Sequence, residues 1–252
     1  MATLKNAVQP EHEFEMPQEV IEQMNSSDGT VRMITEEDVS DLNYVDISGN
    51  PYRWWKRFFD IVLSAVGLLV LLIPMVLVAI AVYIDDPGKV IFAQYRVGLN
   101  GKRFRLYKFR TMKMNTPKYM STMDLHDPDQ YITRVGRILR KTSLDEIPQL
   151  LNVLKGDMSL IGPRPLISDE YEIHTMRSRF GVYSIRPGVT GLAQINGRDT
   201  VSPNEKVHWD VKYLEDFGLK MDLKILFSTV PKLFGGEGVV EGYGEPEWKH
   251  KN

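Results

Sequence analysis

The chain has 252 residues, no cysteine and a formal net charge of −2 at pH 7. Its 43% hydrophobic and 25% charged residues are ordinary globular values, which exclude a wholly disordered or collagen-like chain. The lack of cysteine excludes a disulfide framework, thiolate metal sites, iron–sulfur clusters and a cysteine nucleophile.

The charge is distributed unevenly along the chain. Residues 1–52 hold eleven acidic and two basic residues, a net charge of −9, and we expect a flexible acidic arm there. The rest of the chain holds 22 acidic and 29 basic residues, a net charge of +7. A basic body favours anionic partners such as nucleic acid, phospholipid or phosphorylated substrates.

An apolar segment follows the arm. Residues 61–84 contain no charged residue, and a helix of this length is long enough to span the ~30 Å hydrocarbon core of a bilayer. Trp, Phe and basic residues over 53–59 precede it and are typical of a membrane interface. Pro74 predicts a kink, and basic residues on both flanks favour the cytoplasmic side for both ends. These features leave two alternatives, a re-entrant hairpin and a spanning helix that tolerates its proline.

The elements after the apolar segment are predicted from periodicity and turn residues. Alternating residues predict a β-hairpin over 89–112 with its turn at Gly98–Gly101, followed by an irregular polar connection over 115–132. Thr133 is expected to cap a helix, and 186–198 reads as a turn with a short strand. Helices are expected at 134–141, from about 143 to 155, and at 169–180, 203–217 and 220–234.

The segment from Arg140 to Pro165 contains the residues best suited to chemistry. Ser143 and Glu146 match the capping-box pattern at a helix start, and this structural interpretation also accounts for Asp145 in the first turn. The functional interpretation starts from the same helix end, because free N–H groups there bind anions. A carboxylate beside bound phosphate can attack phosphorus, with a divalent cation to neutralise the repulsion. An Asp-Glu pair next to Arg-rich sequence therefore indicates metal-assisted phosphoryl transfer.

Six segments, in order, resemble the bacterial sugar transferase family, the monotopic polyprenyl-phosphate phosphoglycosyl transferases. They are KRFFDIVLS from Lys56, the proline-containing apolar run, VIFAQYRVG from Val90, RLYKFRTM from Arg105, SLDEIPQLLNVLKGDMSLIGPRP from Ser143 and IRPGVTGLAQINGR from Ile185. The similarity covers about residues 53–235. It corresponds to the small form of the family with an added acidic arm.

The resemblance implies an enzyme that moves sugar-1-phosphate from a UDP-sugar to undecaprenyl phosphate, as the first membrane step of surface polysaccharide or glycoconjugate assembly. It implies a covalent aspartyl-phosphosugar intermediate and release of UMP. Asp145 matches the family's nucleophile, which also contacts Mg²⁺, and Glu146 matches the supporting member of the dyad. Basic residues match substrate-binding positions: Lys108, Arg140 and Arg164 at the substrate phosphates, and Arg198 at the nucleotide.

The resemblance also implies a fold and a location. We expect an α+β, predominantly helical protein with a membrane-embedded re-entrant helix hairpin broken at Pro74 and a small cytoplasmic α/β catalytic domain. The expected location is the bacterial inner (cytoplasmic) membrane, with the catalytic domain facing the cytoplasm. Ile73 replaces the Ser that many members have before the proline, which leaves the kink angle open, and Leu192 replaces a Trp. The expected divisions are the acidic arm (1–52), an amphipathic approach and re-entrant helix (53–88), the catalytic domain (89–235) and a polar tail (236–252).

The expected partners are a UDP-sugar donor, undecaprenyl phosphate and membrane lipids. Nucleic acid is not expected, because the basic residues surround a membrane segment instead of forming one groove-sized helix. The sugar, the glycan pathway and the oligomeric state, including a homodimer, stay open. The alternative function is a non-catalytic membrane-bound scaffold of a glycan assembly complex, against which the intact Asp-Glu dyad argues.

Overall fold

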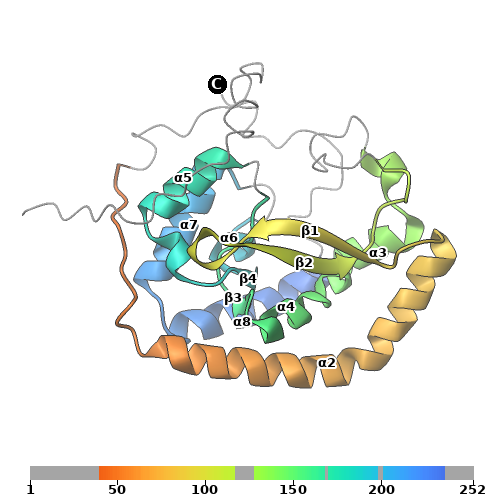
Figure 1. Ribbon diagram of the computed structural model, residues 1–252, viewed down its shortest axis with the longest axis horizontal. Coiled ribbons are helices and arrows are strands. Elements are labelled where there is room, and N and C mark those ends of the chain that lie inside the picture. Colours follow the sequence, from red (N-terminus) through yellow and green to blue (C-terminus); the bar gives the residue numbers. More distant parts are fainter. Residues whose placement is uncertain (1–39, 117–127, 168–169, 198–200, 236–252) are drawn as a thin grey trace, which may run out of the picture. The chain divides into compact units, whose positions relative to one another are not determined.

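The computed structural model describes residues 40–116, 128–167, 170–197 and 201–235 (Figure 1). These residues belong to one compact unit, which is mostly helical and contains two small two-stranded sheets. The predicted α+β, predominantly helical class is confirmed at this level. Residues 1–39 of the expected arm and the expected tail at 236–252 lie outside the described residues.

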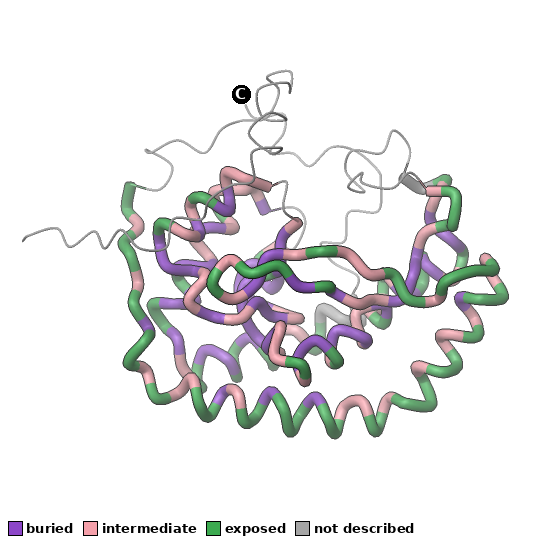
Figure 2. The backbone as a smooth tube through the Cα atoms, viewed as in Figure 1, coloured by how far each residue is buried: buried purple, intermediate pink, exposed green. Residues whose placement is uncertain are grey.

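Helix α2 (Tyr52–Asp85) contains the apolar run. Among the described residues it is the one helix long and apolar enough to cross a membrane, by length and composition. It continues through Pro74 as one helix, and Figure 1 shows it bending toward its C-terminal end. Its apolar side chains are largely exposed, with Leu69 at 75% and Ile73 at 73%, and Figure 2 shows this exposure along the helix. Such a surface is unfavourable in water, so α2 has the character of a lipid-facing segment.

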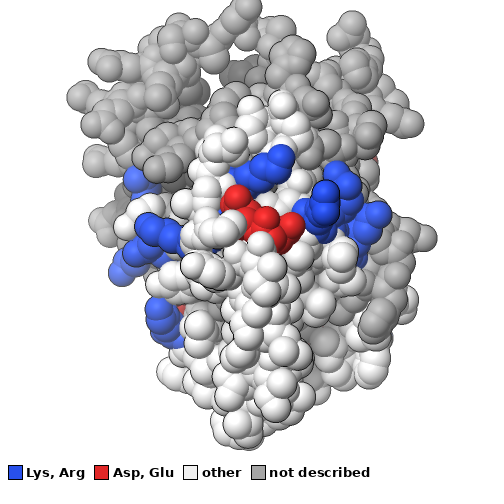
Figure 3. All heavy atoms as spheres, turned by 90° about the vertical axis from the view of Figure 1, so that its right-hand side faces the viewer, with Lys and Arg blue, Asp and Glu red and all other residues white. Residues whose placement is uncertain are grey.

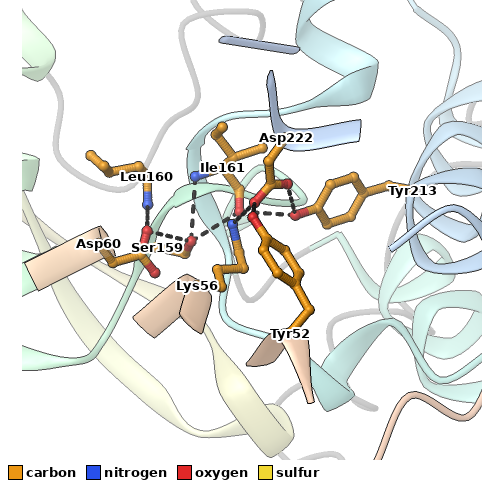
Figure 4. Close-up of polar contacts among 8 residues, drawn as sticks. All are labelled: Tyr52, Lys56, Asp60, Ser159, Leu160, Ile161, Tyr213 and Asp222. Atoms are coloured by element: carbon orange, nitrogen blue, oxygen red, sulfur yellow. Dashed lines mark hydrogen bonds and ion pairs between the residues drawn. The ribbon is translucent and has the colours of Figure 1, made fainter. Parts of the chain in front are cut away.

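The first turns of α2 are anchored to the rest of the unit by a buried polar network, which Figure 4 shows. Asp222 of α8 (Leu219–Gly235) accepts hydrogen bonds from Lys56 Nζ at 2.6 Å and Tyr52 Oη at 2.7 Å, and Tyr213 Oη donates to its other oxygen at 2.7 Å. One turn further along α2, Asp60 Oδ1 accepts from Ser159 Oγ and from the Leu160 amide, both at 3.0 Å. The apolar helix therefore begins with buried charges that face the protein.

The far end of α2 returns to the same unit. Val82 packs in a buried apolar cluster with Phe109 of β2 (Arg103–Phe109) and Leu139 of α3 (Arg134–Thr142). Asp86 follows the helix and pairs with Arg110, Nη1 to Oδ2, at 2.8 Å. Both ends of the helix are thus held by one compact unit.

The predicted β-hairpin is confirmed. β1 (Ile91–Val97) and β2 pair antiparallel, with Phe92 opposite Lys108 and Val97 opposite Arg103. A short 3₁₀ turn, η2 (Leu99–Gly101), joins them, and Asn100 there adopts a left-handed φ of 53°. After the hairpin, Met112 forms an isolated antiparallel bridge with Ile132, and the 3₁₀ turn η3 (Pro128–Tyr131) precedes Ile132. Residues 117–127 of the predicted polar connection lie outside the described residues.

Helix α3 begins as predicted, but the next helix does not. The Thr133 side chain accepts from the Gly136 amide at 2.9 Å, which caps α3. Ser143 was expected to open a capping box with Glu146; instead it has a left-handed φ of 54°, ends α3, and makes no side-chain capping bond. The capping-box prediction is wrong, because Ser143 takes the left-handed conformation typical of the residue that ends a helix, and α4 begins only at Gln149. A 3₁₀ turn, η4 (Leu144–Glu146), precedes α4 (Gln149–Lys155).

The C-terminal half forms the larger apolar core. β3 (Ser159–Ile161) pairs parallel with β4 (Gly188–Thr190), which confirms a short strand in 186–198. Around them lie α5 (Tyr171–Arg179), η5 (Val182–Ser184), α6 (Leu192–Ile195), α7 (Pro203–Glu215) and α8. A capping box does occur, at Ser202 and Glu205 before α7. Fully buried apolar residues of this core include Val207, Val211, Leu214 and Ile225.

Candidate active site

Asp145 and Glu146 lie on the η4 turn between α3 and α4, next to β2. The left-handed Ser143 turns the chain sharply after α3, so the two carboxylates follow directly on the last turn of that basic helix. Asp145 is buried, with 7% of its surface exposed. A carboxylate in such a place needs positive partners, because desolvation of a charge is costly.

The charges around Asp145 act in opposite directions. The pKa of the Asp145 carboxyl is raised to about 6, first by burial and second by repulsion from Glu146. Lys108, Arg140 and Arg164 oppose it, because their positive charge favours the ionised form. The structure therefore brings the expected dyad and three of the expected phosphate-binding cations into one electrostatic cluster.

Lys108 lies on β2 and is partly buried. Its Nζ lies 5.4 Å from the centre of the Phe92 ring on β1. Burial lowers the pKa of the Lys108 ammonium, and the Asp145 carboxylate counteracts this; Arg96 and Arg140 lower it further. The ammonium therefore gains from any added negative charge nearby, such as a phosphate.

Arg140 and Arg164 approach the dyad from two different segments. Arg140 is in the last turn of α3, and its buried Nη1 finds no hydrogen-bond partner among the described residues. A buried donor of this kind is costly unless a ligand oxygen satisfies it. Arg164 follows β3 in the Gly-Pro-Arg-Pro loop, and its Nη1 lies 3.4 Å from Glu146 Oε1.

Two further predicted positions lie elsewhere. Arg198, expected at the nucleotide, lies outside the described residues. Pro74 lies inside α2, in the lipid-facing helix and not in the dyad cluster. Neither residue adds to the described geometry of the site.

The donor set of the dyad is compatible with Mg²⁺. The described part of the chain contains no group of three or more His, Asp or Glu side chains arranged for a metal. Mg²⁺ is commonly held by one or two carboxylates while substrate phosphates and water complete its shell. Asp145 and Glu146 supply two hard oxygen groups at one turn, so the residues present fit this ion.

Two arginines near the site were missed by the sequence analysis. Arg96 on β1 donates from Nη1 to the Pro165 carbonyl at 3.4 Å and lies within electrostatic range of Lys108. Arg177 on α5 donates from Nη1 to the Arg164 carbonyl at 2.9 Å. Arg96 belongs to the YRVG segment of the resemblance, which could have singled it out. Arg177 stands in a polar helix where no local pattern separates a buried arginine from an exposed one.

Comparisons with known proteins identify the family of the chain. The family model described as "Bacterial sugar transferase" matches residues 51–236. The chain is 45% identical over 185 residues to an uncharacterized sugar transferase, EpsL, of Bacillus subtilis, covering 73% of this chain and 89% of that one.

Two longer relatives have more specific names. The chain is 40% identical over 200 residues to the undecaprenyl-phosphate galactose phosphotransferase of Salmonella typhimurium, covering 74% of this chain and 42% of that one. It is 41% identical over 190 residues to the UDP-glucose:undecaprenyl-phosphate glucose-1-phosphate transferase of Escherichia coli, covering 72% of this chain and 40% of that one. The chain thus matches less than half the length of these two relatives.

Proposed function

This chain belongs to the bacterial sugar transferase family, and on that basis we propose that it transfers sugar-1-phosphate from a UDP-sugar to undecaprenyl phosphate and releases UMP. The observation that carries the proposal is Asp145, a buried carboxylate within a cluster of three cations. The three positive charges outnumber the two carboxylates of the dyad, and a surplus of positive charge suits a site that must also bind a diphosphate.

The first step of the proposed reaction uses Asp145 as the nucleophile. A carboxylate oxygen attacks the phosphorus that carries the sugar, and an acyl-phosphate bond forms to sugar-1-phosphate. The bond from that phosphorus to the oxygen of UMP breaks, and UMP leaves with the electron pair. With its pKa at about 6, the Asp145 carboxyl is largely ionised at neutral pH, as the attack requires.

The second step regenerates the enzyme. A phosphate oxygen of undecaprenyl phosphate attacks the same phosphorus, the acyl-phosphate bond breaks, and Asp145 leaves as a carboxylate. The product is the lipid diphosphate-sugar. Lys108 and Arg140 bind the phosphate oxygens in both steps, and the unpartnered Arg140 Nη1 supports this role.

Glu146 and the metal ion complete the proposed site. Glu146 is the proposed supporting member of the dyad, and Arg164, whose Nη1 lies 3.4 Å from Glu146 Oε1, is proposed to bind the substrate phosphates as the resemblance implies. Asp145 is the proposed ligand of Mg²⁺, which when bound neutralises charge on the diphosphate. Arg198 is the proposed contact of the nucleotide, as the resemblance implies.

We further propose that α2 enters the membrane and returns, with the catalytic unit on the cytoplasmic face. A straight helix of 34 residues is ~51 Å long and would carry its two ends to opposite sides of a bilayer. The contacts of Lys56 with Asp222 at one end and of Asp86 with Arg110 at the other support re-entry, because both partners belong to one compact unit.

The charge distribution supports the same placement. Figure 3 turns the right-hand side of Figure 1 to the viewer and shows Lys and Arg flanking a small acidic patch at mid-height. The lowest part of this face shows no charged side chain. A charged band above an uncharged one matches the boundary between lipid headgroups and acyl chains.

The reaction is tested with the purified full chain, Mg²⁺, undecaprenyl phosphate and a panel of UDP-sugars. We expect UMP as the nucleotide product, and the sugar that supports its release identifies the donor. Asp145→Asn is expected to abolish release because an amide cannot attack phosphorus in this way. Release of UDP would overturn the proposal, and absence of both donor binding and turnover would favour the membrane-bound scaffold.

A further inference from the structure

The loop that carries Arg164 is hydrogen-bonded to other segments of the chain through the backbone carbonyls of residues 163–166. Pro163 and Pro165 flank Arg164, so their φ angles are restricted and they donate no backbone hydrogen bond. Each carbonyl from 163 to 166 instead accepts a hydrogen bond from another segment. In the order of these carbonyls, the donors are the Gly188 amide at 2.9 Å, Arg177 Nη1 at 2.9 Å, Arg96 Nη1 at 3.4 Å and the Val97 amide at 3.1 Å.

Arg177 is itself fixed by a buried carboxylate. Its side chain is 3% exposed, and the Asp210 side chain on α7 is 2% exposed. Arg177 donates from Nε to Asp210 Oδ2 at 2.8 Å, and its Nη2 lies 2.6 Å from the same oxygen. Two nitrogens of the planar guanidinium are thus oriented by Asp210, and this leaves Nη1 directed at the Arg164 carbonyl.

The contact that this loop supports is weak by itself. Arg164 Nη1 and Glu146 Oε1 are 3.4 Å apart, and the Arg164 side chain is 46% exposed. Exposed ion pairs of this kind contribute little, because solvent screens them and ordering a long side chain costs entropy. Arg164 will therefore stay opposite the dyad only if its backbone is held in place.

We propose that Arg177, oriented by Asp210, is a positioning residue that holds the Arg164 backbone so that the Arg164 side chain faces Glu146 of the dyad. The Arg177–Asp210 pair thus connects α5 and α7 to the loop of Arg164, through the hydrogen bond that Arg177 donates to the Arg164 carbonyl. The proposal rests on the proposed function for its kinetic consequence, but its structural consequence, a loop loosened without Arg177, is measurable without substrate.

The main test is Arg177→Lys in the full chain. Lysine keeps a buried positive charge beside Asp210. It lacks the planar guanidinium whose separate nitrogens donate to Asp210 and to the Arg164 carbonyl at the same time. The matched control is Arg179→Lys, the same substitution at an exposed position of α5. Where Arg177→Lys fails to fold, Arg177→Gln combined with Asp210→Asn removes both charges and leaves neither one buried alone.

The first measurement is backbone hydrogen exchange by mass spectrometry, without substrate. We expect faster exchange in peptides covering 162–167 for Arg177→Lys or for the double variant, with α5, α7 and the Arg179→Lys control unchanged. Unchanged exchange in this loop, or faster exchange spread over α5 and α7, overturns the proposal and leaves the pair a simple structural link.

The second measurement is a double-mutant cycle on UMP release. We expect kcat to fall about 100-fold for Arg164→Gln, which removes a charged donor near the dyad. We expect a fall of about tenfold for Arg177→Lys, which only misplaces that donor. The combined variant should match Arg164→Gln alone, since Arg177 acts through Arg164; independent, multiplied effects overturn the proposal. If the wild type releases no UMP, the proposed function fails, and the exchange result still decides the positioning role.

Discussion

Asp145 is a buried carboxylate, and the charged residues around it determine how readily it ionises. Burial and Glu146 raise the pKa of this carboxyl, and the cations Lys108, Arg140 and Arg164 limit the rise. A nucleophilic carboxylate benefits from such a balance. It remains ionised near neutral pH, and it is less solvated and therefore more available for attack than an exposed aspartate.

This balance predicts the pH dependence of the reaction. The Asp145 carboxyl, with a pKa of about 6, gains a proton as the pH falls through that value, so kcat/KM for the donor should fall below about pH 6. Lys108→Met removes a charge that lowers this pKa, and the acidic limb should therefore move to higher pH. The matched control is Lys102→Met at an exposed position of the hairpin turn, which should leave the limb unmoved. A limb that stays in place in Lys108→Met would contradict this account of the site.

At the scale of elements, α2 is joined to the unit by buried polar residues at its start. Lys56 and Asp222 have side chains 10% and 7% exposed and lie 2.6 Å apart, and two tyrosine hydroxyls share the carboxylate (Figure 4). Buried pairs of this kind add little net stability compared with an apolar pair. Their geometry is directional, however, and it sets which side of α2 faces the protein and which side is left to lipid.

The network predicts a distinct stability pattern. Lys56→Met leaves the Asp222 carboxylate buried without its cation, so we expect the free energy of unfolding to fall by about 3 kcal/mol. Adding Asp222→Asn removes that charge and should restore part of the loss. The exposed Lys212, which pairs with Glu215 and Asp216 at 3.3 Å, serves as the control, and Lys212→Met should leave the free energy of unfolding nearly unchanged because solvent screens exposed ion pairs. Denaturant unfolding in detergent measures all four proteins, and equal losses for the two single lysine variants would contradict an anchoring role.

At the scale of the whole molecule, the proposed topology places both ends of α2 on one side of the membrane. The proposed donor is water-soluble and the phosphate of the proposed acceptor lies at the headgroup level, so a unit at the membrane surface would reach both. The net charge of +7 outside the first 52 residues suits this anionic surface and the anionic substrates.

Cysteine labelling tests the topology, because the chain has no cysteine of its own. Ser48→Cys before α2 and Lys102→Cys after it occupy exposed positions. In intact cells a membrane-impermeant maleimide should label neither variant, and in permeabilised cells it should label both. Labelling of one variant alone in intact cells would indicate a spanning helix and would overturn re-entry.

The sequence by itself determined the elements whose signals are local. Side-chain period and capping depend on neighbouring residues, and they predicted the apolar run, the hairpin over 89–112, the Thr133 cap and the helices near 169–180, 203–217 and 220–234. The Asp145–Glu146 dyad was likewise predicted from adjacent residues, and the order of six motifs indicated the family that the comparisons confirm.

Only the tertiary structure decided what depends on distant residues. The sequence predicted a capping box at Ser143, but the chain reverses there, and the η4 turn that follows packs against β2, which is distant in sequence. The contact of Lys56 with Asp222 joins residues 166 positions apart, and that of Arg177 with Asp210 joins two helices. Because these charged residues are buried, their contacts fix how the helices are oriented. No local sequence pattern indicates burial, since burial is a property of the packed chain.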